Sequence, residues 1–106
     1  MISSTEIRRR LPNRREHELL SFEHSGIYYT AGFGSFDNGD LAEIFLNARK
    51  HGTAVDVNAR DAAVAASLLL QHGCPVDKLR KALTRNSDGS ASGPLAHALD
   101  LVAEER

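Results

Sequence analysis

Cysteine and long apolar runs are scarce in this chain of 106 residues, and both shortages exclude classes of protein. The single cysteine, Cys74, excludes an internal disulfide framework and a thiolate metal cage within one chain, so we expect no metal and no cofactor. No apolar run approaches the roughly 20 residues needed to span a bilayer. The arginines near the N-terminus are not followed by the apolar segment of a secretory signal. We therefore predict a cytoplasmic protein with no membrane partner.

Charge is nearly balanced overall, at −1, but is unevenly distributed along the chain. The segment 1–16 lacks apolar periodicity and carries a cluster of basic residues, namely Arg8, Arg9, Arg10, Arg14 and Arg15. We interpret it as a basic, mobile arm preceding one acidic domain over residues 17–104. The five arginines are candidate phosphate contacts for nucleic acid. A solubilising tail explains them equally well, because no aromatic residues alternate with them.

The domain sequence changes from strand periodicity to helix periodicity near residue 50. Alternating apolar residues and turn-forming pairs at Ser25-Gly26 and Asn38-Gly39 predict three antiparallel strands, over residues 17–24, 27–35 and 41–47. Capping and periodicity predict helices over residues 53–73, 75–85 and 94–104. The fold class is therefore α+β, a three-stranded antiparallel meander followed by three helices packed on one face.

Two glycine-containing stretches resemble chemical motifs but do not complete them. The loop 85–94 lacks the preceding strand and the lysine of a P-loop, and in "GSASG" alanine stands at the nucleophile position. We interpret it as a connection between helices, with Ser92 or Gly93 capping the last helix. "GFG" at residues 32–34 has no following helix and indicates close packing or a bulge in a strand.

Titratable residues also form no complete catalytic or metal-binding constellation. The five histidines have no metal-ligand spacing, and His72 with Cys74 is too little for a zinc site. We expect His72 to cap the end of the long helix. Asp56, Arg60 and Asp61 could act in acid–base chemistry, but on a helix they are more typical of a solvated face with local ion pairs.

Excess apolar surface points to a partner. Strict alternation places Leu41 and Phe45 on the second face of the sheet, where Tyr28 and Thr30 of the preceding strand also fall. An antiparallel sheet covered on one side only should be polar on its second face. The run at residues 62–70 is likewise apolar in more directions than one small sheet can cover. We predict a homodimer, or a protein partner docked on this face; coverage by the two short helices is the alternative.

The stretch from "GIYYTAGFGSFDNGDLAEIFLNARKHGT" to "AASLLLQHGCPVDKLRKAL" resembles the TSCPD domain over about residues 22–100. That family occurs at the C-terminal end of cobalamin-dependent ribonucleotide reductases and as short free-standing bacterial and phage proteins. The resemblance implies a Thr-Ser-Cys-Pro-Asp motif before the last helix, but residues 90–94 read Ser-Ala-Ser-Gly-Pro. A second family cysteine is replaced within residues 85–88. Metal binding and thiol chemistry therefore do not carry over.

These observations favour a non-catalytic accessory or regulatory module that acts by protein–protein interaction and is related to the reductase tail domain. A nucleic-acid-associated or phage-derived regulator, using the arginine arm, is the alternative. A small enzyme ranks third, because no complete catalytic constellation is present.

Overall fold

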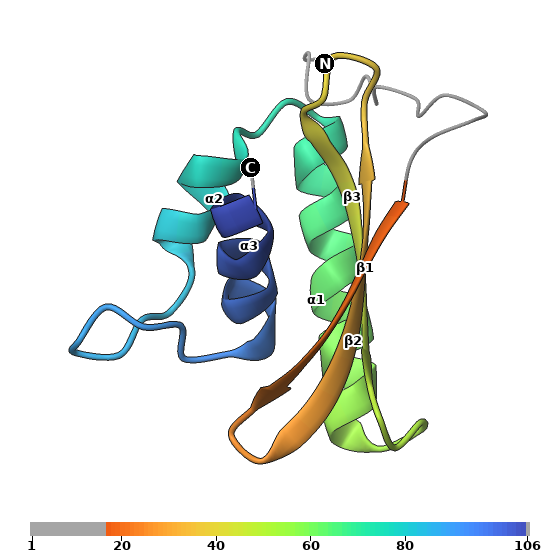
Figure 1. Ribbon diagram of the computed structural model, residues 1–106, viewed down its shortest axis with the longest axis vertical. Coiled ribbons are helices and arrows are strands. Elements are labelled where there is room, and N and C mark those ends of the chain that lie inside the picture. The colour runs from red at the N-terminus through yellow and green to blue at the C-terminus, as the bar shows by residue number, and fades with distance from the viewer. Residues whose placement is uncertain (1–16, 106) are drawn as a thin grey trace, which may run out of the picture.

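The computed structural model describes residues 17–105, apart from the side chain of His17, and confirms the α+β class (Figure 1). The elements along the chain are β1 (His17–His24), β2 (Ile27–Ser35), β3 (Leu41–Ala48), α1 (Ala54–Gln71), α2 (Val76–Ala82) and α3 (Pro94–Glu105). The five arginines of the predicted arm lie outside the described residues. The division into an arm and a domain therefore stays a prediction.

The strands form one antiparallel sheet in the order β1-β2-β3, joined by two tight turns. Ser25 and Gly26 connect β1 to β2 with φ angles of 52° and 80°, the two positive values that a two-residue hairpin turn requires. In the second turn only Gly39 is left-handed, with φ of 92°. Asn38 instead accepts a hydrogen bond from the Asp40 N–H at 3.0 Å. The turn predicted from Asn38-Gly39 is therefore present, with its positive φ confined to the glycine.

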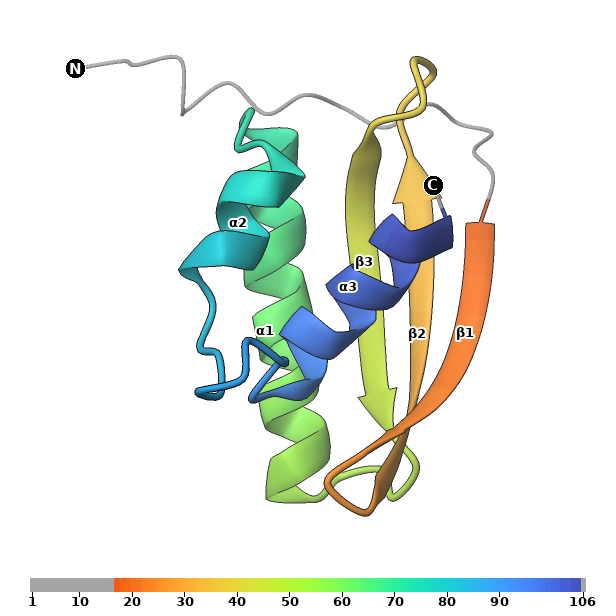
Figure 2. The ribbon, with the colours of Figure 1, turned by 60° about the vertical axis from the view of Figure 1, so that its left-hand side comes forward.

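The core lies between one face of the sheet and two of the helices, α1 and α3 (Figure 2). Phe33 and Ile44 are 1% exposed and lie on neighbouring strands of this inner face. The apolar inward positions of α1 are Ala59, Ala63, Ala66 and Leu70, and the small alanines allow the helix axis to lie close to the sheet. Leu99 and Val102 of α3 complete the cluster, and α2 contributes Leu79. One face of the sheet is thus covered by the chain's own helices.

The helix ends follow the predicted chemistry with one difference. Thr53 caps α1 by accepting a hydrogen bond from the Asp56 N–H, and the left-handed Gly73 follows the C-cap residue, His72. α2 ends at Ala82, three residues before the predicted end, because Leu83 has an extended backbone. Within residues 17–105, none of the helices combines the length and apolar character that crossing a membrane demands.

Candidate interaction surface

The second face of the sheet, opposite the helices, carries large apolar side chains that contact solvent. Tyr28 of β2 and Phe45 of β3 are 52% and 50% exposed, and Thr30 is exposed on the same face. Leu19 of β1 joins them at 75% exposed. The sequence predicted the first three but missed Leu19, because the pair Leu19-Leu20 does not reveal which leucine faces the core. The strand register decides which leucine faces the core: Leu19 lies opposite Gly32, a second-face position of β2, and so points to the second face.

Leu41 does not lie on this face, so its predicted place beside Phe45 is wrong. A β-bulge shifts the register after Gly34, pairing Gly34 with Glu43 and Ser35 with Leu41. Ala42 is the extra residue of the bulge, and it reverses the inward–outward alternation of the side chains that precede it in β3. Leu41 therefore points into the core and is 6% exposed.

Gly32 and Gly34 leave room for side chains from the neighbouring strands on this second face. A Cβ at Gly32 would lie 3.4 Å from the Leu19 side chain and 3.6 Å from that of Phe45. A Cβ at Gly34 would lie 2.8 Å from Glu43 Oε1. Both predicted explanations of "GFG" are confirmed, because Gly32 provides close packing and Gly34 adjoins the bulge. Leu19 and Phe45 consequently converge over Gly32 into one apolar patch.

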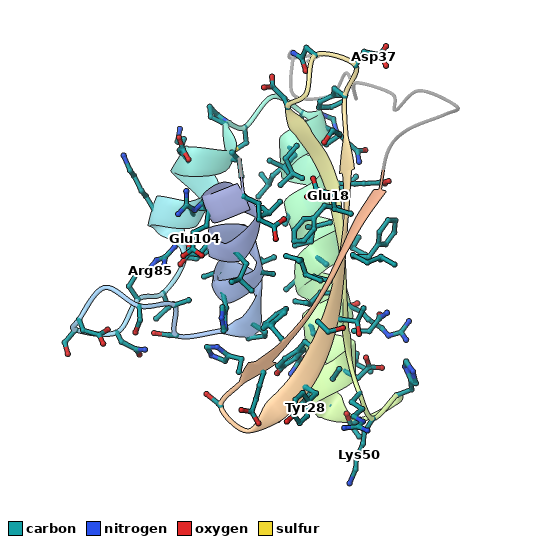
Figure 3. The ribbon with its side chains drawn as sticks, in the orientation of Figure 1. Glu18, Tyr28, Asp37, Lys50, Arg85 and Glu104 are labelled. Carbon is teal, nitrogen blue, oxygen red and sulfur yellow. The ribbon has the colours of Figure 1, made fainter. Side chains whose placement is uncertain are left out.

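Polar and cationic groups border this patch at the end of the sheet near Tyr28. The Arg49 guanidinium lies over the Tyr28 ring, 5.5 Å from its centroid, which is a cation–π contact. Figure 3 shows Tyr28 at the same end of the molecule as Lys50. An apolar centre with a polar rim is the usual composition of a protein interface.

The outer edge of the sheet at β3 is sealed by polar side chains of α1. Three side chains form hydrogen bonds with the outward main-chain groups of this strand. Ser67 Oγ accepts from the Ile44 N–H at 2.9 Å and donates to the Ile44 C=O at 3.0 Å. Gln71 Nε2 donates to the Ala42 C=O at 3.1 Å, and Asp56 Oδ1 accepts from the Ala48 N–H at 3.0 Å. Exposed strand edges invite pairing with another chain, and such caps prevent it. Ser67, the one polar residue in the apolar run 62–70, therefore serves to close this edge.

Beyond that edge the apolar surface continues onto α1. Val64 and Leu68 are 59% and 42% exposed and line a groove of about 370 Å³ with Phe45. The apolar surface thus extends from the second face of the sheet around β3 to the outer side of α1. It agrees with the prediction that the long helix has more apolar directions than the sheet covers.

Asp56 was predicted to lie on a solvated helix face, and that prediction is wrong. The residue is 1% exposed, and its carboxylate accepts hydrogen bonds from the Ala48 and Gly52 N–H groups and from Arg60 Nε. The hydrogen bond from the Gly52 N–H is the largest cause lowering the pKa of Asp56. Burial raises this pKa, but the donors together outweigh burial, so the pKa is lowered overall. The predicted local ion pair is present as Asp56 with Arg60, at 3.0 Å. Asp56 therefore joins the end of β3 to the start of α1.

The loop between α2 and α3 is a connection that satisfies its own polar groups. Arg85 and Ala91 form an isolated antiparallel bridge, and the Asn86 N–H donates to the Ser90 C=O at 2.9 Å. Arg85 then donates two hydrogen bonds to Asp100 of α3, and these hold the pKa of that carboxyl below its usual range. The loop is therefore anchored to α3 through one arginine.

By the resemblance, this loop carries the cysteines of the family, but its donors here do not fit a thiolate metal site. Ser92 Oγ donates to Asn86 Oδ1 at 2.9 Å, so hydroxyl and amide groups bond each other. Over residues 17–105 no three His, Cys, Asp or Glu side chains gather in a way that could hold a metal ion. Cys74 lies elsewhere, in a cavity that Asp40 and Asp77 also line.

Two histidines meet where the β1–β2 hairpin contacts α3, a contact that the sequence did not reveal. His24 Nε2 lies 3.0 Å from the Ser92 carbonyl, which can only accept, so Nε2 carries the proton. When His24 is neutral, its Nδ1 accepts from His97 Nδ1 at 2.8 Å. Burial is the largest cause lowering the pKa of His97, followed by the charge that a protonated His24 carries, while Asp100 and Glu104 oppose them. The pair accordingly favours a neutral His97.

This arrangement predicts a pH dependence of stability. Because the folded-state pKa of His97 is depressed, its contribution is complete above the ordinary pKa of about 6.5 and is lost as pH falls through the folded-state value. The Tm of the wild type should therefore fall more steeply between about pH 7 and 5 than that of His97→Asn, whose amide keeps a donor but does not titrate. Calorimetry at several pH values measures both slopes. Parallel slopes would show that His97 does not contribute.

The fold defines a class, a small α+β domain with one covered and one solvent-facing side of its sheet. Comparison with known proteins identifies the family: the TSCPD domain model matches residues 4–104, so the chain belongs to the TSCPD domain family. The resemblance seen in the sequence is thereby confirmed. The match begins inside the predicted arm and includes its five arginines.

The curated relatives are much longer proteins. The chain is 34% identical over 77 residues to the vitamin B12-dependent ribonucleotide reductases of Agrobacterium fabrum and Bradyrhizobium diazoefficiens. The aligned region covers 73% of this chain and 6% of each reductase. No solved structure matches the chain.

Proposed function

We propose that this protein is a non-catalytic accessory module that binds a ribonucleotide reductase through the second face of its sheet. The observation that carries the proposal is the exposure of Leu19, Tyr28 and Phe45 on a face that an isolated domain would keep polar. The family relation supplies the partner class, because similar sequences form a small part of vitamin B12-dependent reductases.

The loop between α2 and α3 supports the non-catalytic part of the proposal. Its serines and asparagine are bonded to one another, and its arginine is committed to Asp100. The most buried carboxylate, Asp56, is held ionised by main-chain donors and Arg60, which leaves it unsuited to accept a proton near neutral pH. These polar residues of the described part of the chain thus stabilise the fold.

Binding to the Agrobacterium fabrum reductase, immobilised for biolayer interferometry, tests the proposal. Wild-type protein should bind, and Phe45→Ser and Tyr28→Ser should each weaken the Kd about tenfold or more, because central aromatic residues supply much of the free energy of an interface. Lys78→Ser on α2 is the matched control and should bind like wild type. Circular dichroism verifies that each variant is folded, and nuclease treatment removes bridging through nucleic acid.

Two results would contradict the proposal. Absence of wild-type binding to the reductase would remove the partner. Equal loss of binding in Lys78→Ser and Phe45→Ser would show that the second face is not the contact surface.

A further inference from the structure

The two edges of the sheet are treated differently. β3 has its outward main-chain groups bonded by Ser67, Gln71 and Asp56 of α1. β1 forms the opposite edge, with no described helix or strand beyond it (Figure 2). Within the part of the chain that the structure describes, one edge is thus sealed against strand pairing and the other has no neighbouring strand.

The hairpin register identifies the available groups of β1. A two-residue turn makes its flanking residues, His24 and Ile27, a hydrogen-bonded pair, and such pairs recur at every second residue. The N–H and C=O groups of Leu19, Ser21 and Glu23 therefore point away from β2. Within residues 17–105 no side chain is bonded to these outward groups, and all three residues are exposed.

We infer that β1 pairs antiparallel with β1 of a second copy, about a two-fold axis through Ser21, to form one six-stranded sheet. A two-fold interface brings the same patch together from both copies and must therefore be self-complementary. In this register Ser21 faces Ser21 of the partner subunit, and the outward N–H and C=O groups of both strands bond each other.

The sequence of β1, "HELLSFEH", fits this self-pairing on the inner face of the sheet. The register sets Leu20 opposite Phe22 of the partner subunit, and these partly buried apolar residues already border the core. This pair occurs twice because of the two-fold axis. Cross-strand apolar pairs stabilise antiparallel sheets.

A proline at position 21 tests this interface without disrupting the fold of the subunit. The Ser21 N–H points outward, so Ser21→Pro removes a donor to the partner strand without removing a bond to β2. Sedimentation equilibrium should give twice the 11.6 kDa chain mass for the wild type and for Ser21→Thr. For Ser21→Pro it should give the mass of one chain, with dimerisation weakened about a hundredfold or more. Circular dichroism verifies that Ser21→Pro keeps its fold.

Cysteine crosslinking tests the register without depending on proline. In a Cys74→Ser background, Ser21→Cys places two thiols across the axis at a Cα separation of about 5.5 Å, suitable for a disulfide. It should form a covalent dimer on mild oxidation. Leu19→Cys, which faces Glu23 of the partner subunit, should crosslink far more slowly.

A wild-type mass of one chain up to millimolar concentration would overturn the inference. So would a folded Ser21→Pro that remains a dimer, or faster crosslinking by Leu19→Cys than by Ser21→Cys. The outcome is independent of reductase binding, because the Phe45→Ser and Tyr28→Ser substitutions lie on β3 and β2.

Discussion

Replacement of Asp56 by asparagine is expected to lower the Tm by about 10 °C or more, since a small domain has little stability to lose. The carboxylate accepts from the Ala48 and Gly52 N–H groups at 3.0 and 2.9 Å and from Arg60. An asparagine amide keeps one acceptor oxygen but turns an NH₂ group toward a donor. The junction of β3 with α1 therefore loses at least one bond in a place that water reaches poorly. Thermal unfolding followed by circular dichroism measures the change.

Asp61→Asn is the matched control for this substitution, because Asp61 is an exposed carboxylate on the same helix. It should leave the Tm within a degree or two of wild type, as surface substitutions usually do.

The pKa of Asp56 is lowered in the folded state, so the stability that Asp56 contributes is present above the unfolded-state pKa near 3.8 and is lost as pH falls through the folded-state pKa. Asp56→Asn should thus also reduce the acid sensitivity of unfolding. Equal effects of the two substitutions would refute the proposed role of Asp56.

Removal of the Asp100 carboxylate is expected to cost about 2 kcal/mol of unfolding free energy, the scale of hydrogen bonds to charged groups. Asp100 is the common acceptor for Arg80 Nε at 3.0 Å and for both terminal nitrogens of Arg85. Its side chain is 23% exposed, so solvent screens the pair only in part. Asp100→Ala removes the acceptor that Arg80 and Arg85 share and releases the α2–α3 loop from α3. Urea denaturation should show a lower midpoint.

Asp77→Ala is the control for Asp100, because both carboxylates bind Arg80. Asp77 lies 3.3 Å from Arg80 Nη1 with a side chain 76% exposed, and such exposed pairs contribute about 0–1 kcal/mol. Its effect should be small and should shrink further in high salt. A loss as large as that of Asp100→Ala would mean that the loop is not held through Asp100.

The order and type of the elements follow from local chemistry and could be predicted without the structure. Thr53 caps α1 and Gly73 follows its end, because capping and a positive φ depend on neighbouring residues alone. The Ser25-Gly26 turn and Pro94 at the start of α3 are local in the same sense. The second-face positions of Tyr28, Thr30 and Phe45 follow from strict alternation within regular strands. The family resemblance depends on the same local sequence.

Contacts between distant residues were decided by the tertiary structure. The bulge after Gly34 depends on how β2 meets β3, and it moved Leu41 from the second face into the core. The burial of Asp56 depends on β3 lying against α1, and the His24–His97 contact joins residues 73 positions apart. The periodicity of a segment reports which of its faces is apolar, but not which main-chain donors of another segment will reach a given side chain. For that reason the sequence determined the elements and the family of this protein, whereas packing determined which polar residues stabilise it and that α1 seals the β3 edge of its sheet.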